Sequence, residues 1–349
     1  MSELDRFYAD VAAGDLQPLW TQTRNLMPDE PRPTAKPWLW RWKLVRPLCA
    51  RAGELVPIER GGERRVLSLS NPGLGGLPFA APTLWAAFQF LRPRESAPAH
   101  RHSPGAIRFV IEGEGAWTTV DGDACDMTPG DLVLTPSWCW HDHKNASDRP
   151  MIWFDGLDMP TVIALDAVFF EPHPDAAQPI IGRNVSERVF GGRGTVPAGK
   201  PHTKRHSPLL VYRWRDVDAA LAAQLDSSGQ GEATLRYVNP LDGSSALPTL
   251  GCAMTRLRPG RRTRPMRRAG SAVYVVFHGS GRSIIDGQRF VWEPGDSFVV
   301  PSWATVEHEA IDAADLFSID DRPIFERLGL DREETLERPQ TVRGEFEPR

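Results

Sequence analysis

The stretch from His100 to Asn145 constrains this chain more than any other. It opens with His100 and His102, and it closes with His141 just after the apolar run 131–136, which predicts a strand. Side chains two residues apart lie on one face of a strand, so the first two imidazoles are expected to point the same way. Three imidazoles that converge inside a small barrel make a facial metal site. A His-x-His pair alone is equally typical of a protein surface.

The spacing within this stretch resembles the two-part signature of the cupin family. The residues that match are His100, His102, Gly113, Gly130, Pro136, His141 and Asn145. Ala106 stands where that family usually has a glutamate ligand, and Trp138 stands in place of a glycine. A site with three histidines and no carboxylate is similar to the gentisate 1,2-dioxygenase family and its salicylate and 1-hydroxy-2-naphthoate dioxygenase relatives.

Composition excludes some classes of protein. The formal net charge of −4, with both signs mixed along the chain, argues against a nucleic-acid binder. No apolar run is long enough for a transmembrane helix, and the N-terminus lacks the pattern of a signal peptide. The 4 cysteines include no Cys-x-x-Cys pair and indicate reduced thiols of a cytoplasmic protein, with Cys139 packed near His141 rather than binding metal.

The chain is long enough for more than one domain, and abundant turn residues favour short strands. With the resemblance, this predicts an all-β dominated bicupin fold: two double-stranded β-helix (jelly-roll) barrels with an N-terminal helical arm and a helical connector. The expected segments are an arm at 1–60, an iron-binding barrel at 61–160, a connector at 161–247, a second barrel at 248–325 and a charged tail at 326–349. Residues 158–166 read as a strand that leads into a loop, and the tail as a helix with a frayed end.

The second barrel is predicted to be an internal repeat without metal ligands. Its turns and its Pro-Ser-Trp segment echo those of the first barrel. Aligning the repeats places Met266, Arg268 and Val306 opposite His100, His102 and His141, whereas His308 answers His143. One metal per chain is therefore expected.

Arg108 and Gln89 are polar residues within apolar predicted strands. Arg108 has the parity of both first-barrel ligand histidines, and a buried arginine is costly unless it meets an anion. We interpret it as an inward residue for a substrate carboxylate, with a surface position as the alternative. Gln89 is either a core amide with satisfied hydrogen bonds or a pocket residue that faces substrate.

The resemblance implies further roles. It places Trp85, Gln89 and Arg108 along an aromatic substrate pocket, with His143 beside the metal and Asp155 supporting His143. An ordinary turn acid is the alternative for Asp155. An arginine before the first long strand is also implied; Arg64 and Arg65 compete for that role, and Arg64 is preferred. The resemblance further implies a homotetramer.

The activity that the resemblance implies is an Fe(II)-dependent, extradiol-type ring cleavage of a 2-hydroxyaryl carboxylate, with gentisate and O2 giving maleylpyruvate in aromatic catabolism. His100, His102 and His141 would bind the iron, while His143, Asp155 and Arg108 would be catalytic. One alternative is a salicylate or 1-hydroxy-2-naphthoate 1,2-dioxygenase on the same scaffold. Another is a cupin that only binds a small acid.

Overall fold

The computed structural model describes residues 1–57, 65–192, 194–199 and 204–347, in two compact units, 1–33 and 34–349. The smaller unit holds α1 (Glu3–Ala13), the 3-10 turn η1 (Leu19–Thr21) and α2 (Thr23–Leu26). Ser2 starts α1 with a capping box, because its hydroxyl accepts the Asp5 amide while the Asp5 carboxylate accepts the Ser2 amide. Within the described residues, no helix combines the length and apolarity needed to cross a bilayer.

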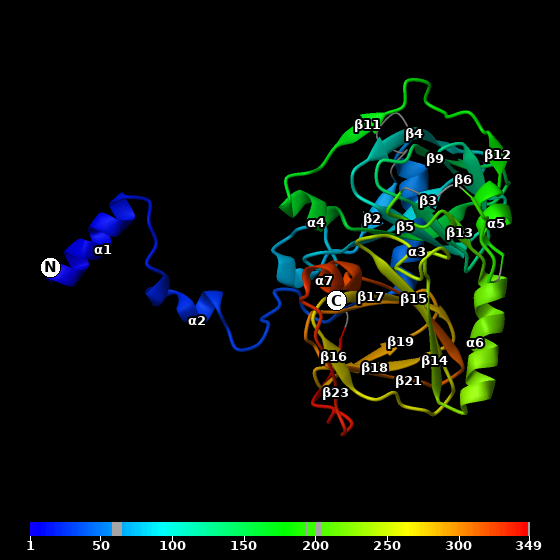
Figure 1. Cartoon of the computed structure of the whole chain (residues 1–349). Helices are drawn as coiled ribbons and strands as arrows, with labels where there is room; N and C mark the ends of the chain where they lie inside the picture. Colours follow the sequence, from blue (N-terminus) through cyan, green and yellow to red (C-terminus); the bar gives the residue numbers. More distant parts are fainter. Residues whose placement is uncertain (58–64, 193, 200–203, 348–349) are drawn as a thin grey trace. The chain divides into compact units, whose positions relative to one another are not determined.

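The first barrel consists of two six-stranded sheets that pack face to face (Figure 1). In spatial order, the first sheet contains β13 (Val211–Tyr212), β8 (Leu132–Thr135), β5 (Ala106–Glu112), β10 (Met151–Leu157), β3 (Trp85–Leu91) and β2 (Val66–Ser68). The second contains β11 (Phe170–Pro172), β4 (Ser96–His102), β9 (His141–Asn145), β6 (Ala116–Val120), β7 (Asp123–Met127) and β12 (Gly182–Arg183).

The second barrel has the same plan. One sheet contains β1 (Trp38–Trp40), β20 (Ser297–Val300), β17 (Ala272–His278), β22 (Ala314–Asp320), β15 (Gly251–Leu257) and β14 (Glu232–Arg236). The other contains β23 (Glu333–Thr335), β16 (Met266–Arg268), β21 (Val306–Ala310), β18 (Gly281–Ile285), β19 (Gln288–Trp292) and β24 (Gly344–Glu345). Strands β15 to β22 repeat β3 to β10 in the same order and pairing, which confirms the internal repeat and the bicupin fold.

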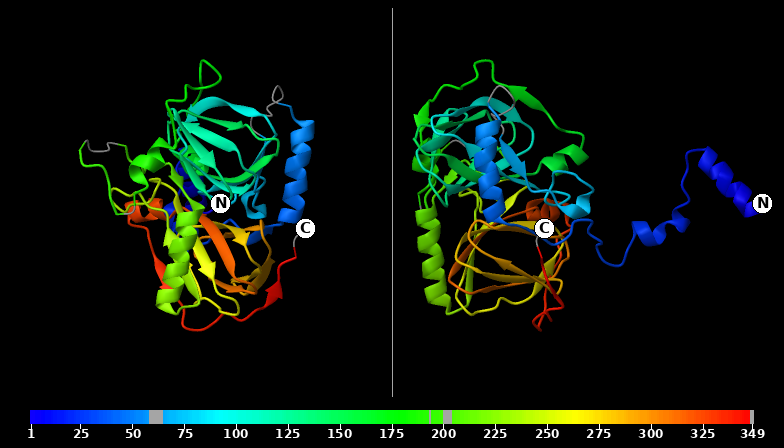
Figure 2. Two further views of the ribbon diagram at one scale, coloured as in Figure 1. Left: turned by 90° about the vertical axis from the view of Figure 1, so that its right-hand side faces the viewer. Right: turned by 180° about the vertical axis from the view of Figure 1, so that it is seen from behind.

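Helices cover the outside of the barrels. Helix α3 (Trp42–Leu55) packs on β3, and α6 (Trp214–Ser228) packs on β14 and β15, as the views in Figure 2 also show. The short helix α5 (Val185–Phe190) lies against β7. The helical connector is thus confirmed, whereas the boundaries of the five predicted segments remain our proposal.

Two local predictions were wrong. Residues 159–164 form helix α4 rather than a strand, because Pro160 fits the first helical turn and the Asp158 carboxylate is held by the Gly105 amide at 2.8 Å. The tail is not frayed through its described part. After α7 (Arg322–Leu328), it adds β23 and β24 to the second barrel and buries Phe346 against Phe290.

Strand alternation divides the first barrel's β3–β5–β10 sheet into two faces. Phe109 and Phe154 lie on the face that packs against the second barrel, and Phe109 stacks on Phe317 with ring centroids 4.1 Å apart. Arg108 and Asp155 lie on the opposite face, inside the first barrel, where they are directly paired. The core therefore joins the two barrels through one face and leaves the other face for the site.

Replacing Phe317 with alanine should lower the free energy of unfolding by about 3–5 kcal/mol, because it removes a fully buried ring from the barrel contact. Denaturant unfolding would measure this. Leu165→Ala is the control, since Leu165 is 71% exposed and should change stability by less than about 0.5 kcal/mol. Equal effects of the two changes would contradict the assigned core.

Candidate metal centre

Two paired strands bring the three histidines together. His100 and His102 lie on β4, and His141 lies on β9 directly opposite His100. One ligand atom from each residue lies within 4.8 Å of the others. Within the described ranges, this is the one such cluster of histidine, cysteine or carboxylate ligands. The structure therefore contains a three-histidine site that fits a metal ion.

Backbone carbonyl groups fix the orientation of all three imidazoles. The Nδ1 atoms lie at hydrogen-bonding distance from three carbonyl oxygens: His100 from Pro98 at 3.0 Å, His102 from Pro104 at 2.8 Å and His141 from Cys139 at 3.0 Å. A carbonyl can only accept, so each Nδ1 carries the proton and each Nε2 presents a lone pair. The buried His141 Nε2 has no hydrogen-bond partner among the described residues, as expected of a metal-binding atom.

The surroundings favour neutral ligands. Burial, reinforced by Arg108, lowers the pKa of His141 well below its usual value. Ala106, at the position of the usual glutamate ligand, is fully buried. The Cys139 side chain lies beside Lys204 and His206, and burial raises its thiol pKa to about 12. A neutral thiol directed to other partners is not a metal ligand.

Arg108 lies inside the same barrel and is 4% exposed. Its Nη1 donates to the Thr135 hydroxyl at 2.5 Å, and its Nε lies 3.5 Å from an Asp155 oxygen. Asp155 also accepts a 3.0 Å hydrogen bond from Trp153 Nε1. Burial raises the pKa of Asp155 to about 6 although Arg108 opposes this shift. Because the ion pair with Asp155 is long, the Arg108 guanidinium can still attract a second anion.

Gln89 and Trp85 share the interior-facing side of β3. Gln89 is 7% exposed and pairs directly with Trp153, which also lies beside the His143 ring. Trp85 Nε1 donates to the Ser68 hydroxyl at 3.0 Å, which holds the indole at the end of the strand. The alternation of β3 therefore directs both side chains toward the side of the barrel that contains the histidines.

His143 is buried next to the three-histidine site. Its Nδ1 lies 2.9 Å from the Thr118 hydroxyl, and its ring lies 5.2 Å from that of Trp153. The Thr118 hydroxyl lies within hydrogen-bonding distance of both His143 Nδ1 and Met127 Sδ. The contact with Thr118 engages Nδ1, so Nε2 is the nitrogen of His143 that remains for other partners.

Two candidates were predicted for the arginine before the first long strand, Arg64 and Arg65. Arg64, the preferred residue, lies outside the described residues. Arg65 is buried, pairs with Glu95 and donates to the Val56 carbonyl at 3.1 Å. These contacts hold its guanidinium between the end of α3 and the turn that precedes β4. Asp155, expected to support an imidazole, instead pairs with Arg108 and Trp153.

Sequence reasoning missed Thr135, Thr118 and Trp153. Thr118 and Trp153 contact His143, whereas Thr135 holds Arg108 from the neighbouring strand β8. Thr135 is the last residue of β8. Arg108, which donates to its hydroxyl group, lies 27 residues away along the chain. Only the register of the sheet shows that the two residues are neighbours.

His141→Ala should abolish tight metal binding, because two imidazoles remain. Metal affinity should fall by more than the roughly 10–100-fold that is typical when a residue that only hydrogen-bonds to a metal ligand is removed. Metal analysis after reconstitution should fall from about one ion per chain, given one ligand cluster, to near zero. Cys139→Ala is the matched control and should keep its metal. Metal retained at full occupancy by the His141 variant would exclude this histidine as a ligand.

Comparison with known proteins agrees with this geometry. Residues 87–157 match the "Cupin domain" family model. A gentisate 1,2-dioxygenase from Streptomyces is 51% identical and aligns over 94% of both chains. A 5-aminosalicylate 1,2-dioxygenase from Comamonas is 38% identical over 99% of this chain and 95% of its own.

The crystal structure of a salicylate 1,2-dioxygenase from Pseudaminobacter salicylatoxidans superposes with a TM-score of 0.92, at 44% identity, covering 96% of this chain and 98% of that one. A mutant of that enzyme has also been crystallised in complex with gentisate. Identity at this level over nearly the whole chain places the site within a known group of enzymes. The chain belongs to the gentisate 1,2-dioxygenase family of bicupin, ring-cleaving dioxygenases.

Proposed function

We propose that this enzyme is an Fe(II)-dependent dioxygenase that converts gentisate and O2 to maleylpyruvate in aromatic compound catabolism. The observation that carries the proposal is the buried guanidinium of Arg108 inside the barrel that holds three Nε2 lone pairs. A metal site next to a buried cation fits a substrate that carries a carboxylate beside a metal-binding hydroxyl.

The donor set suits iron. His100, His102 and His141 would hold Fe(II) through their Nε2 atoms, and all three are neutral donors of the borderline kind that iron accepts. Bound Fe(II) would supply a redox-active centre with open coordination positions, so no separate organic cofactor is required. The chain's own residues then have to bind, orient and protonate the substrate.

Arg108 would hold the substrate carboxylate. Thr135 and Asp155 fix its guanidinium from two sides, which limits its rotation and preorganises it for an anion. We assign Asp155 this positioning role because its ion pair is with Arg108. Trp85 and Gln89, which share the face of the sheet with Arg108, would shape the pocket around the ring.

His143 would move protons during ring attack and oxygen–oxygen bond cleavage. The hydrogen bond to Thr118 leaves its Nε2 able to take a proton, and burial keeps the pKa of its imidazole well below the usual value. In the proposed reaction both atoms of O2 enter the product. The bond between the carboxylate-bearing carbon and the hydroxyl-bearing carbon is broken.

The choice of substrate rests on the relatives. Gentisate, 5-aminosalicylate and salicylate dioxygenases all act on a 2-hydroxybenzoate and differ at ring position 5, so the shared part is the one that the metal and Arg108 would bind. Gentisate is favoured by the 51% identity of the Streptomyces enzyme. Salicylate is the second candidate, favoured by the high structural similarity to the salicylate enzyme.

Turnover of gentisate, salicylate and 1-hydroxy-2-naphthoate by the iron-loaded enzyme tests this choice. Gentisate should give the highest kcat/KM, and mass spectrometry should identify maleylpyruvate as its product. A higher kcat/KM for salicylate or 1-hydroxy-2-naphthoate would overturn the assignment of gentisate as substrate. Turnover of none of the three would contradict the proposed substrate class.

We also propose that the enzyme is a cytoplasmic homotetramer. The unit at residues 1–33 supports an oligomer, since none of the described side chains in α1 is buried and Phe7 and Trp20 are exposed. Four free, buried cysteines support a reducing compartment. Light scattering tests the assembly state, and a monomer would contradict it.

Arg108→Ala should cost about 2–5 kcal/mol in kcat/KM for gentisate, because it removes one partner of a buried charge pair. Arg108→Lys should bind iron normally but turn over poorly, since lysine keeps the charge and loses the planar, two-pronged geometry. Hydroquinone, which lacks the carboxylate, is the control ligand. Unchanged preference of the alanine variant for gentisate over hydroquinone, at normal iron content, would exclude this role.

A further inference from the structure

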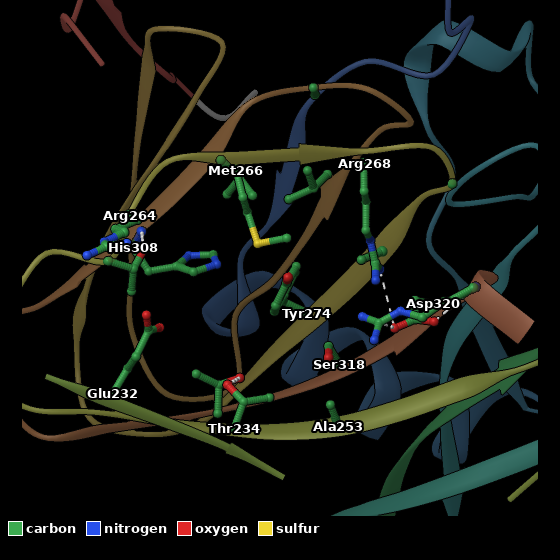
Figure 3. A pocket seen from close by; sticks show the side chains of 18 of the residues that line it. Glu232, Thr234, Ala253, Arg264, Met266, Arg268, Tyr274, His308, Ser318 and Asp320 are labelled. Carbon is green, nitrogen blue, oxygen red and sulfur yellow. Dashed lines mark hydrogen bonds and ion pairs between the residues drawn. The ribbon is translucent and has the colours of Figure 1, made fainter. Parts of the chain in front are cut away.

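The second barrel encloses a cavity of its own. Its volume is about 150 Å3, and strands from both sheets of the barrel line it (Figure 3). Small barrels are usually filled by their own side chains, so a purely structural barrel would not be expected to leave this space. An engineered cavity of about 150 Å3 in another protein holds a benzene molecule. The space is thus large enough for one six-membered ring.

This cavity is the counterpart of the metal centre. Met266 and Arg268 on β16, and Val306 on β21, line it from the strands that correspond to β4 and β9. Figure 3 shows the side chains of Met266 and His308 extending toward one another, with Arg268 directed toward Asp320. At the positions of the three ligand histidines, the second barrel thus has a thioether, a guanidinium and an aliphatic side chain, and a cavity remains between them.

His308 of the second barrel hydrogen-bonds to a hydroxyl group, as His143 of the first barrel does. The Ser283 oxygen accepts from Trp292 Nε1 at 2.9 Å, and His308 Nδ1 lies 2.7 Å from the same oxygen. The buried Ser283 proton needs an acceptor, and Nδ1 provides it. His308 Nε2 therefore carries the proton and is a donor. Burial lowers the pKa of His308 to about 4, so the ring stays neutral.

The charges around the cavity favour an anion. Asp320 lies 3.3 Å from Arg268 and 3.7 Å from Arg322, so one carboxylate is shared by two guanidinium groups. With Glu232 and the exposed Arg264 included, three arginines and two carboxylates line the space. The Tyr274 hydroxyl group is a further polar group of the lining, and its ring lies 5.2 Å from that of His308.

We propose that the second barrel binds a small carboxylic acid with a single apolar ring, at a site separate from the metal centre. Arg268 and Tyr274 would hold the carboxylate, and Met266 and Val306 would contact the ring. The site contains no metal-ligand cluster within the described residues, so it is a binding site without ring-cleaving chemistry. The inference does not depend on the activity proposed above.

Calorimetric titration of the iron-loaded, full-length protein with benzoate tests the proposal. Benzoate has the ring and carboxylate but lacks the 2-hydroxyl group, and the Arg108→Ala background weakens its binding in the first barrel. In that background, benzoate should still bind at one site per chain. Adding Arg268→Gln should raise Kd at least about tenfold, the equivalent of about 1.4 kcal/mol. Acetate, which lacks the ring, should bind at least about tenfold more weakly than benzoate.

Tyr274→Phe provides a second variant if Arg268→Gln impairs folding, because it removes only one oxygen atom. It should weaken benzoate binding in the Arg108→Ala background while thermal unfolding stays unchanged. In the otherwise wild-type enzyme, it should leave gentisate turnover unaffected. Absence of benzoate binding in the Arg108→Ala protein would overturn the proposal, and so would binding that neither second-barrel variant weakens.

Discussion

The hydrogen bonds between three imidazole Nδ1 atoms and backbone carbonyls are the interactions on which the metal centre depends. Each carbonyl belongs to a residue two positions from its histidine, so the local backbone in or beside the strand determines which nitrogen carries the proton. No additional carboxylate is needed to select the tautomer. The three-histidine site is thus a property of β4, β9 and the residues that flank them, and other positions in the barrel are available for substrate-binding residues.

One such position holds Arg108, and its environment explains why a buried charge is tolerated. Thr135 satisfies one guanidinium nitrogen, whereas Asp155 lies at the long distance of 3.5 Å and is itself held by Trp153. The second barrel differs, because Asp320 there is shared by Arg268 and Arg322. The two interiors thus have a similar plan, with an arginine and a buried histidine in each, but among the described residues only the first has a cluster of metal ligands.

Much of this arrangement follows from the sequence, because a strand period of two residues relates positions that are close along the chain. The shared face of His100 and His102 and the inward position of Arg108 were predicted on that basis, and the repeat of the barrel was predicted from its repeated turns. Contacts between segments that are distant along the chain were not predicted. β1 precedes the first barrel in sequence but pairs with β20 of the second, and no local pattern indicates this.

Helix α4 shows a second limit of local patterns. Its Val162 and Ile163 are β-branched and favour a strand, but Pro160 at the first turn and the contacts of Asp158 with Gly105 and Thr249 select a helix. Both partners of Asp158 lie in loops far away in sequence, Gly105 just before β5 and Thr249 just before β15. The role of Asp155 was similarly undetermined, because its pairing with Arg108 depends on the register of β5 and β10.

The most direct test of the account is the stoichiometry of oxygen and substrate consumption by iron-loaded enzyme without added reductant. Simultaneous oxygen-electrode and chromatographic measurements should show one O2 consumed for each gentisate that disappears, with no hydrogen peroxide released. This is the balance of a reaction that places both oxygen atoms in the ring-opened product. A requirement for an external electron donor, or oxygen consumption without ring opening, would contradict the assignment of this site as a ring-cleaving dioxygenase centre.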